Sequence, residues 1–280
     1  MIKALLTVAT AALLSSAAFA DVTIQGQIEE RVETTNGVSD LKGDNYIGVV
    51  IDQDLGTNGM SAFGKIEFAV DGDSAANADA VTNREVYVGI DFGPVAVSAG
   101  KMPNLRKSMI QSAPGYFKGN SLLVTGQSRT DDTVKIQGEI AGVTLAATTI
   151  LDGTANADKV GETRELGASI DLNGVALSAV NTKVGSADAT MMYGAKVALS
   201  DAKIGIAYEP DATNVTTTVT GAYNFGNNTL MVGNQFVDGS ENTMIAEGTH
   251  NFSKNVYAFA GYKKPEDSDA TTAIGLGIKF

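Results

Sequence analysis

The sequence predicts an all-β protein, a transmembrane antiparallel up-and-down β-barrel of about 16 strands. Three observations predict this fold. The chain opens with an export segment, its apolar residues then alternate with polar ones in repeated strands, and short and long connections alternate between those strands.

The first 20 residues predict a cleaved secretory signal peptide. They read MIKALLTVATAALLSSAAFA, with one lysine, an apolar run and an Ala18-Phe19-Ala20 cleavage pattern before Asp21. An N-terminal membrane anchor is the alternative, but the apolar run is short and ends in small residues. Residues 1–20 are therefore expected to be removed, which leaves residues 21–280 as the barrel.

The composition limits how such an exported chain is held together. Cysteine is absent, so disulfides are excluded, and the 44% hydrophobic content is too high for a disordered chain. The 31 glycines and 5 prolines suit many strands joined by turns. The formal net charge of −12 argues against nucleic acid as a partner.

The candidate strands are mostly long enough to cross a bilayer as tilted strands, which takes about 9–11 residues. In chain order they are Val22–Thr34, Asn45–Leu55, Gly59–Asp71, Thr82–Phe92, Pro94–Lys101, Asp132–Ile140, Gly142–Ile150, Thr163–Leu172, Gly174–Val184, Ala189–Ser200, Ala202–Glu209, Asn214–Phe225, Asn228–Asp238, Glu241–Phe252, Asn255–Lys264 and Ala270–Phe280.

Two kinds of connection alternate between these strands. The short, turn-like ones are Phe92-Gly93-Pro94, Ala141-Gly142, Leu172-Asn173-Gly174, Ser200-Asp201-Ala202, Phe225-Gly226-Asn227 and Phe252-Ser253-Lys254. The longer ones are Thr35–Asp44, Gly72–Val81, Met102–Asp131, Leu151–Glu162 and Pro265–Asp269. This alternation is typical of membrane barrels with short periplasmic turns and longer outer loops.

The two faces of each strand differ in polarity. In the first strand Val22, Ile24, Ile28 and Val32 alternate with polar or charged residues. A membrane barrel places its apolar face outward around a wet lumen, whereas a small soluble barrel fills its interior with apolar side chains. Periodicity alone does not say which face points inward.

Aromatic residues at the strand ends favour the membrane alternative. Phe92, Phe225, Phe252 and Phe280 lie at the short-turn ends, while Tyr46, Tyr208 and Tyr262 lie near the loop ends. Two such belts match the interfacial girdles of membrane barrels. The last strand, Ala270–Phe280, is expected to pair with Val22–Thr34 and so close the barrel.

Several motifs carry a resemblance to a known family. Residues 45–60, NYIGVVIDQDLGTNGM, are similar to a strand and turn of Gram-negative general diffusion porins, which read E-D-L-G-x-G there. Residues 83–93 resemble that family's N-R-x-x-x-x-G-L-x-G-x-F-G, Gly100-Lys101 its G-R, and residues 129–134 its R-x-D-N-S-I/V. Together with Phe280, the resemblance spans residues 21–280.

The resemblance implies a homotrimeric barrel in the Gram-negative outer membrane that passes small hydrophilic solutes and ions passively. It implies that residues 102–131 fold inward as the third, constriction loop, and that the lipid bilayer and lipopolysaccharide are partners. It also implies that the outer-membrane assembly machinery recognises Phe280. A non-conducting barrel that serves as an envelope anchor or adhesin remains the alternative.

The constriction loop departs from the acidic pattern of the family. Residues 102–130 contain no Asp or Glu but carry four basic residues, Arg106, Lys107, Lys118 and Arg129. A field of opposite polarity is expected, with these bases facing wall acids such as Glu29, Glu33, Glu67 or Glu85; the alternative is that they are solvated or contact lipopolysaccharide phosphates. Arg31, Lys65, Arg84 and Lys101 complete the candidate lumen residues, because charged rings set channel selectivity.

Other chemistries have little support in the sequence. The one histidine, His250, lies beside Phe252 at a predicted periplasmic turn, away from where a Ser-His-Asp hydrolase needs it. Cys/His zinc ligands are absent, and the acidic residues of 71–79 do not have the EF-hand spacing for calcium. The chain is therefore expected to be no enzyme and to use no cofactor or metal.

Overall fold

The computed structural model describes residues 20–56, 59–70, 81–115, 117–118, 129–151, 163–185, 187–210 and 214–280. The predicted signal peptide lies outside these residues, except for Ala20, which begins the first strand. The acidic segment 71–79 and most of the second half of the predicted constriction loop also lie outside them.

The described residues form 17 strands and one short π-helical segment, η1 (Arg106–Ile110). The strands are β1 (Ala20–Thr35), β2 (Val38–Gly43), β3 (Asn45–Asp54), β4 (Ser61–Val70), β5 (Val81–Asp91), β6 (Val95–Pro103), β7 (Arg129–Ile140), β8 (Val143–Ile150), β9 (Thr163–Leu172), β10 (Val175–Val184), β11 (Thr190–Leu199), β12 (Ala202–Pro210), β13 (Val215–Phe225), β14 (Asn228–Val237), β15 (Thr243–Asn251), β16 (Val256–Pro265) and β17 (Thr271–Lys279). None of the helical segments in this part of the chain has the length and hydropathy to cross a membrane.

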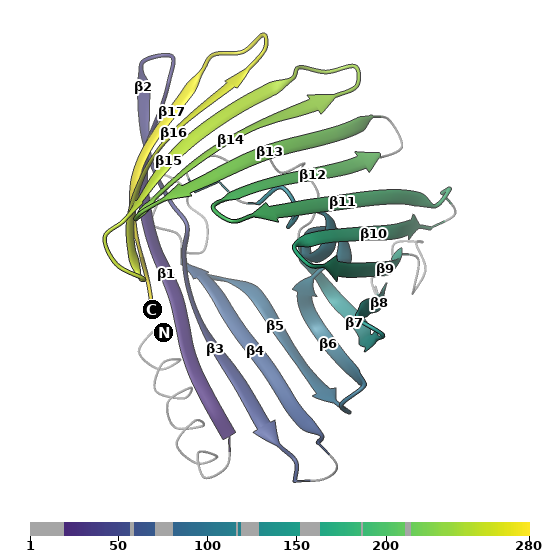
Figure 1. Ribbon diagram of the computed structural model, residues 1–280. Helices are drawn as coiled ribbons and strands as arrows, with labels where there is room; N and C mark the ends of the chain where they lie inside the picture. Colours follow the sequence, from purple (N-terminus) through teal and green to yellow (C-terminus); the bar gives the residue numbers. More distant parts are fainter. Residues whose placement is uncertain are drawn as a thin grey trace.

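Antiparallel pairing joins the strands into one closed barrel, which counts as 16 strands (Figure 1). β2 and β3 count as one strand because they lie end to end along β1, where β2 pairs with Glu30–Thr35 and β3 with Ala20–Gln27. The predicted fold class is therefore confirmed, and the strand number agrees with the prediction.

The first long connection was predicted wrongly. Thr35–Asp44 is mostly strand, because β1 turns directly into β2 through Asn36 and Gly37, whose φ angles are 51° and 74°. An Asn-Gly pair with both residues in the left-handed region is the preferred two-residue hairpin turn. The sequence signal for this turn was present at residues 36–37, but the polar residues that follow obscured the pattern of the strand.

β17 closes the barrel against β1, as expected from the sequence. The two strands pair from Gln27 opposite Lys279 to Thr35 opposite Thr271. Phe280 extends this pairing, because its backbone N–H and C=O bond to Gly26 at 3.1 and 2.9 Å. The N-terminal and C-terminal strands thus lie side by side, as Figure 1 shows.

The apolar face of the wall points outward. On β1, Ile24 and Ile28 are 57% and 53% exposed, whereas Gln27 and Glu29 are only 7% and 2% exposed. A soluble barrel has the opposite arrangement, so this pattern identifies a wall that faces lipid and a polar interior.

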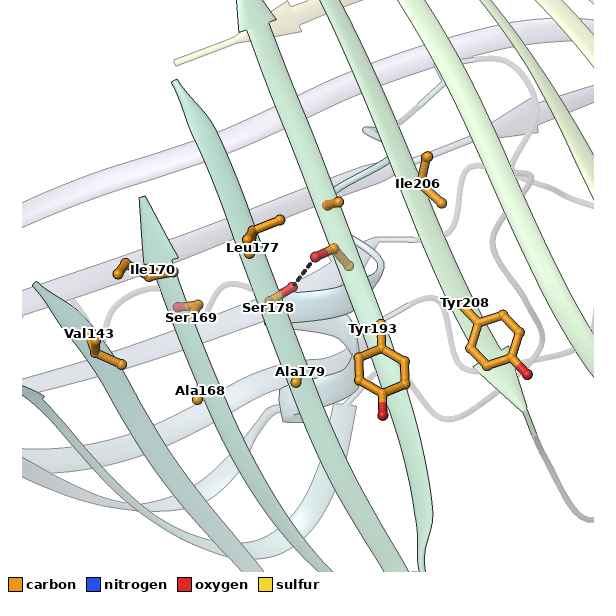
Figure 2. A pocket seen from close by; sticks show the side chains of 12 residues that line it. Val143, Ala168, Ser169, Ile170, Leu177, Ser178, Ala179, Tyr193, Ile206 and Tyr208 are labelled. Carbon is orange, nitrogen blue, oxygen red and sulfur yellow. Dashed lines mark hydrogen bonds between the residues drawn. The ribbon is translucent and has the colours of Figure 1, made fainter. Parts of the chain in front are cut away.

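The region from β8 to β12 shows both faces at once. Leu177, Tyr193 and Tyr208 border a hollow of about 450 Å³ on the outer surface of the wall (Figure 2). Ser178, next to Leu177 on β10, bonds instead to the backbone O of Met109, which precedes Ile110 in η1. Adjacent residues of one strand therefore contact the outside and the inside.

The predicted aromatic belts are present with one correction. Phe92, Phe225, Phe252 and Phe280 are exposed at the short-turn ends, and Tyr208 and Tyr262 are exposed near the loop ends. Tyr46 does not belong to the belt. It pairs with the inward-facing Gln27, and Arg84 lies over its ring at 4.3 Å from the centroid.

Neighbouring residues of β7 offer a direct check on the two faces. Ile136 is 50% exposed, whereas Gln137 pairs with the buried Ala146 and so faces inward. In lipid vesicles Ile136→Lys is expected to lower the free energy of unfolding by about 2–4 kcal/mol, because it puts a charge against hydrocarbon. Gln137→Lys is expected to cost under about 1 kcal/mol, because lumen charges stay hydrated. Equal costs in urea unfolding would contradict the assigned faces.

Candidate functional site

The interior of the barrel holds buried carboxylates. A buried charge is stable only with charged or hydrogen-bonding partners. Among the described residues, six glutamates are each at most 5% exposed and lie on six different strands; they are Glu29, Glu67, Glu85, Glu165, Glu209 and Glu247. Their partners define the candidate site.

A network of ion pairs links β4, β5 and β7. Lys65 Nζ lies 2.8 Å from both Glu67 Oε2 and Glu85 Oε2. Arg129 Nε lies 2.7 Å from Glu85 Oε1, and its Nη2 is 3.9 Å from Glu67 Oε1. Arg84 Nε is 2.9 Å from the same Glu67 oxygen. The two carboxylates thus share three cations.

A second network lies on β1 beside β16. Arg31 Nε is 2.7 Å from Glu33 Oε1, and its Nη1 is 3.6 Å from Glu29 Oε1. The Tyr257 hydroxyl donates a hydrogen bond to Glu29 Oε2. The buried Glu29 is therefore held by one charge, one hydroxyl and the side-chain amide of Gln27, whose Nε2 donates to Oε2 at 3.5 Å.

The segment after β6 bonds to glutamates of the opposite wall. The Leu105 backbone N–H donates to Glu165 Oε2 at 2.7 Å, and Arg106 Nε lies 2.5 Å from Glu209 Oε2. Farther along, the Lys118 backbone N–H donates to Glu247 Oε1 at 2.9 Å. Three wall carboxylates on β9, β12 and β15 therefore bind Leu105, Arg106 and Lys118.

Apolar packing holds the same segment. Leu105 and Ile110 are fully buried and form a cluster with Val180, Met192 and other inward residues of β8–β12. The wall residues are small where the segment approaches. A Cβ on Gly205 would collide with the backbone of Ala113, and glycines 167 and 194 have similarly close contacts. The sequence therefore provides both the apolar contacts and the space.

The two lysines of this segment have different surroundings. Burial first, and then the positive charges of Arg129 and Arg84, lower the pKa of Lys107 to about 8. Lys118 Nζ lies over the Tyr257 ring, 4.4 Å from its centroid. Burial first, and then Lys279, lower the pKa of Lys118.

The remaining candidates lie near the ends of strands. Lys101 Nζ is 3.2 Å from Asp131 Oδ1, and it follows a β-bulge at Gly100, whose φ is 132°. His250 Nδ1 lies 2.8 Å from Asn228 Oδ1, and its ring contacts Phe252. Within the described residues, no three His, Cys, Asp or Glu side chains gather as metal ligands.

The structure brings loop bases and wall acids together, in a different pairing from the one expected. Arg129 reaches the expected Glu67 and Glu85, but Arg106 pairs with Glu209. The sequence reasoning missed Glu165, Glu209 and Glu247. Their period-two positions indicate an inward face, but nothing local indicates which residues they bind. The loop is also shorter than expected, because Met102 and Pro103 belong to β6 and residues 129–131 to β7.

Comparisons with known proteins point to one family. A sequence model of a family described as Gram-negative porin matches residues 6–270. No curated protein matches the chain. Among solved structures, a loop-deletion mutant of OmpT, an outer membrane protein of Vibrio cholerae, has a TM-score of 0.75 at 17% identity and covers 93% of this chain and 99% of that chain.

Two further structures have the same fold. The anion-selective porin from Comamonas acidovorans has a TM-score of 0.75 at 15% identity, with 93% of this chain and 100% of that chain covered. OmpF from Salmonella typhi, in complex with daunomycin, has a TM-score of 0.74 at 13% identity, with 92% and 97% covered. At these identities the likeness shows the fold alone.

The ion pair between Arg106 and Glu209 allows a double-mutant test. Glu209→Gln leaves the part-buried Arg106 without a carboxylate and is expected to lower the free energy of unfolding by about 3–5 kcal/mol. Arg106→Gln combined with Glu209→Gln is expected to cost less than the sum of the single variants. Urea unfolding in vesicles measures this, and purely additive costs would contradict a direct pair.

Proposed function

Because the chain belongs to the Gram-negative porin family, we propose that residues 104–118 narrow its water-filled channel for small hydrophilic solutes and ions. The diffusion channel and its place in the outer membrane follow from the family and the fold. The proposal concerns where the channel is narrowed and which residues line the narrow part.

One observation carries this proposal. Residues 105–118 bond to the wall at Glu165, Glu209 and Glu247, and the charges of Arg84 and Arg129 are close enough to lower the pKa of Lys107. The segment is bonded to the wall at β9, β12 and β15, and the charges of β5 and β7 act on it from the other side. This placement supports a narrowed passage between the two parts of the wall. The candidate lining residues are the cations and carboxylates of β1, β4, β5 and β7 together with Lys107.

Passive diffusion needs no catalytic group, and we propose that the chain has no enzymatic activity. His250 supports this, because it contacts Asn228 and Phe252 at an exposed turn. Turnover of an ester or peptide substrate that is lost in His250→Ala would contradict it.

A non-conducting barrel is the second candidate. The apolar cluster of Leu105, Ile110, Val180 and Met192 favours it, because this cluster fills part of the interior. Recordings of a variant without residues 104–118 separate the candidates. A silent wild type with a conducting deletion variant would favour the anchor or adhesin.

We also propose that the barrel assembles as a homotrimer. Glu30 shares the outward face of Ile28 and Val32, and Asn45 Nδ2 donates to its Oε1 at 2.7 Å. A carboxylate against lipid is unfavourable, so contact with a second copy of the chain would shield it. Native mass spectrometry that finds only monomers would contradict this proposal.

We propose lipopolysaccharide as a partner of the barrel rim that carries the long loops.

Phe280 is proposed as a contact of the outer-membrane assembly machinery. The Phe280 side chain is half exposed, while its backbone is fixed to Gly26, so the ring is accessible on an ordered strand. Phe280→Ala is expected to reduce folded protein in cells more than it changes conductance. Equal yields would contradict the assembly role.

Two glycines test whether residues 104–118 set the conductance. Gly205→Leu puts a side chain where Ala113 lies and must displace this segment, whereas a Cβ on Gly221 of the paired strand would meet only Val232 Cγ2, at 3.9 Å. In planar bilayers Gly205→Leu is expected to change the single-channel conductance in KCl, and Gly221→Leu is expected to leave it unchanged. The absence of any conductance steps from refolded wild-type protein would contradict the channel itself.

Identical conductance in all three proteins would contradict the narrowing role of the segment and leave the channel in place. The two outcomes are therefore separable in one set of recordings.

A further inference from the structure

The outer surface of β8–β12 carries an apolar hollow. Its volume of about 450 Å³ is in the range of small-ligand sites. Ala168 of β9 and Ala179 of β10 are cross-strand partners, and their small side chains leave space between bulkier neighbours, as Figure 2 shows. Ile170 and Leu177, the next outward pair, border the hollow on the short-turn side, and Leu177 is 44% exposed. The hollow is therefore open to the hydrocarbon of the bilayer.

Two tyrosines border the hollow on the side of the long loops. Tyr193 pairs with Ala179 and with Tyr208, and the two ring centroids are 6.3 Å apart. Tyr208 belongs to the aromatic belt near the loop ends, and such belts lie at the level of the lipid headgroups. The hollow therefore lies at the depth where the acyl chains of that leaflet begin.

Two cations face outward above the hollow, nearer the long loops. Arg164 of β9 and Lys183 of β10 are direct cross-strand partners, and both are exposed. Each lies four residues from the alanine of its own strand, Ala168 or Ala179, which is about 13 Å along the strand. Like charges directly opposite each other are unfavourable, so an anion bound to both cations would offset their repulsion.

A polar side chain lies between the cations and the hollow. Asn181 is on the outward face of β10, midway between Ala179 and Lys183. Its Nδ2 donates to Met191 Sδ at 3.2 Å, and a thioether is only a weak acceptor. The outward residues of β10 thus place a charge, an amide and an apolar hollow in succession. A membrane lipid has its phosphate, its ester groups and its acyl chains in the same order.

We infer that Arg164, Lys183 and the hollow at Ala168 and Ala179 form a binding site for one membrane lipid with an anionic phosphate headgroup. The two cations bind the phosphate, Asn181 donates to an ester oxygen, and an acyl chain fills the hollow. This inference deepens the proposal that lipid is a partner of the long-loop rim, on which it rests. It does not depend on conduction.

A lipid fits this surface better than a second copy of the chain. The contact between copies is proposed at Glu30 on β1, and β1 lies on the other side of the barrel from β8–β12 (Figure 1). A second copy with a net charge of −12 could supply a carboxylate for the cations, but a lipid supplies the phosphate and the hydrocarbon together.

Quenching of one introduced tryptophan by brominated lipid tests the site, because the chain has no tryptophan of its own. Tyr193→Trp places the reporter at the edge of the hollow in refolded full-length barrel. Vesicles contain phosphatidylglycerol or phosphatidylcholine with the same brominated chains, at fixed salt. Quenching is expected to show about a tenfold preference for phosphatidylglycerol, because basic side chains near the surface attract anionic lipid. Adding Arg164→Gln and Lys183→Gln is expected to abolish the preference.

Two controls separate the site from the rest of the wall. Phe236→Trp reports on lipid at the loop end of β14, where the native side chain is 44% exposed, and is expected to show no preference. Lys264→Gln removes one outward cation of the same rim, where its Nζ donates to the Ser268 backbone O, and is expected to keep the preference at Tyr193→Trp. Equal preferences at the two reporter positions would overturn the site.

Filling the hollow tests the place of the acyl chain. In the Tyr193→Trp background, Ala179→Leu is expected to weaken the preference for phosphatidylglycerol. Ala99→Leu, on the exposed face of β6 between Val88 and Val134, is expected to keep it. An unchanged preference in Ala179→Leu would overturn the acyl-chain site.

Shielding of the Tyr193→Trp reporter from both lipids would indicate a second copy over the hollow and would also overturn the site. Quenching of the Phe236→Trp reporter still shows a barrel with lipid at its wall. Failure of the site is therefore distinguishable from failure of the barrel to meet lipid.

Discussion

Hydrogen bonding between β1 and β17 removes the two free edges that the sheet would otherwise present to lipid. Inside a bilayer each unpaired backbone group is costly, so a sheet spans it only when closed. The pairing runs from Gln27 opposite Lys279 to Thr35 opposite Thr271, and Phe280 adds its own bonds to Gly26. This register also decides the faces, because a shift of one residue would turn Ile28 inward and Glu29 toward lipid.

The contents of the lumen follow from that register. Buried glutamates on the inner face need partners, and residues 105–118 supply several of them at Glu165, Glu209 and Glu247. Small wall residues such as Gly205 let the segment approach, and Leu105 and Ile110 then pack against the inward apolar residues. On the other side, Lys65, Arg84 and Arg129 neutralise Glu67 and Glu85. Ion pairing thus both holds the segment and sets the local charge.

The sequence predicted features that depend on local pattern, and it failed where distant residues meet. Period-two alternation correctly predicted the wall, and the pairing of Ala270–Phe280 with the first strand is confirmed. The hairpin at Asn36-Gly37 was missed because polar residues obscured β2, although its turn signal was visible. The pair between Arg106 and Glu209 spans 103 positions. The alternation assigns each residue to a face of its strand but does not identify its partner. This pair could therefore be found only from the three-dimensional structure of the closed barrel.

The central claim is that a wet interior and a lipid-facing exterior alternate along each strand. Because the chain has no cysteine, single cysteines at successive positions 28–33 of β1 can be tested one at a time with a membrane-impermeant thiol reagent on barrels in vesicles. We predict modification at 29, 31 and 33 and protection at 28, 30 and 32. Modification at the even positions, or at all six alike, would contradict an aqueous lumen lined by the polar face.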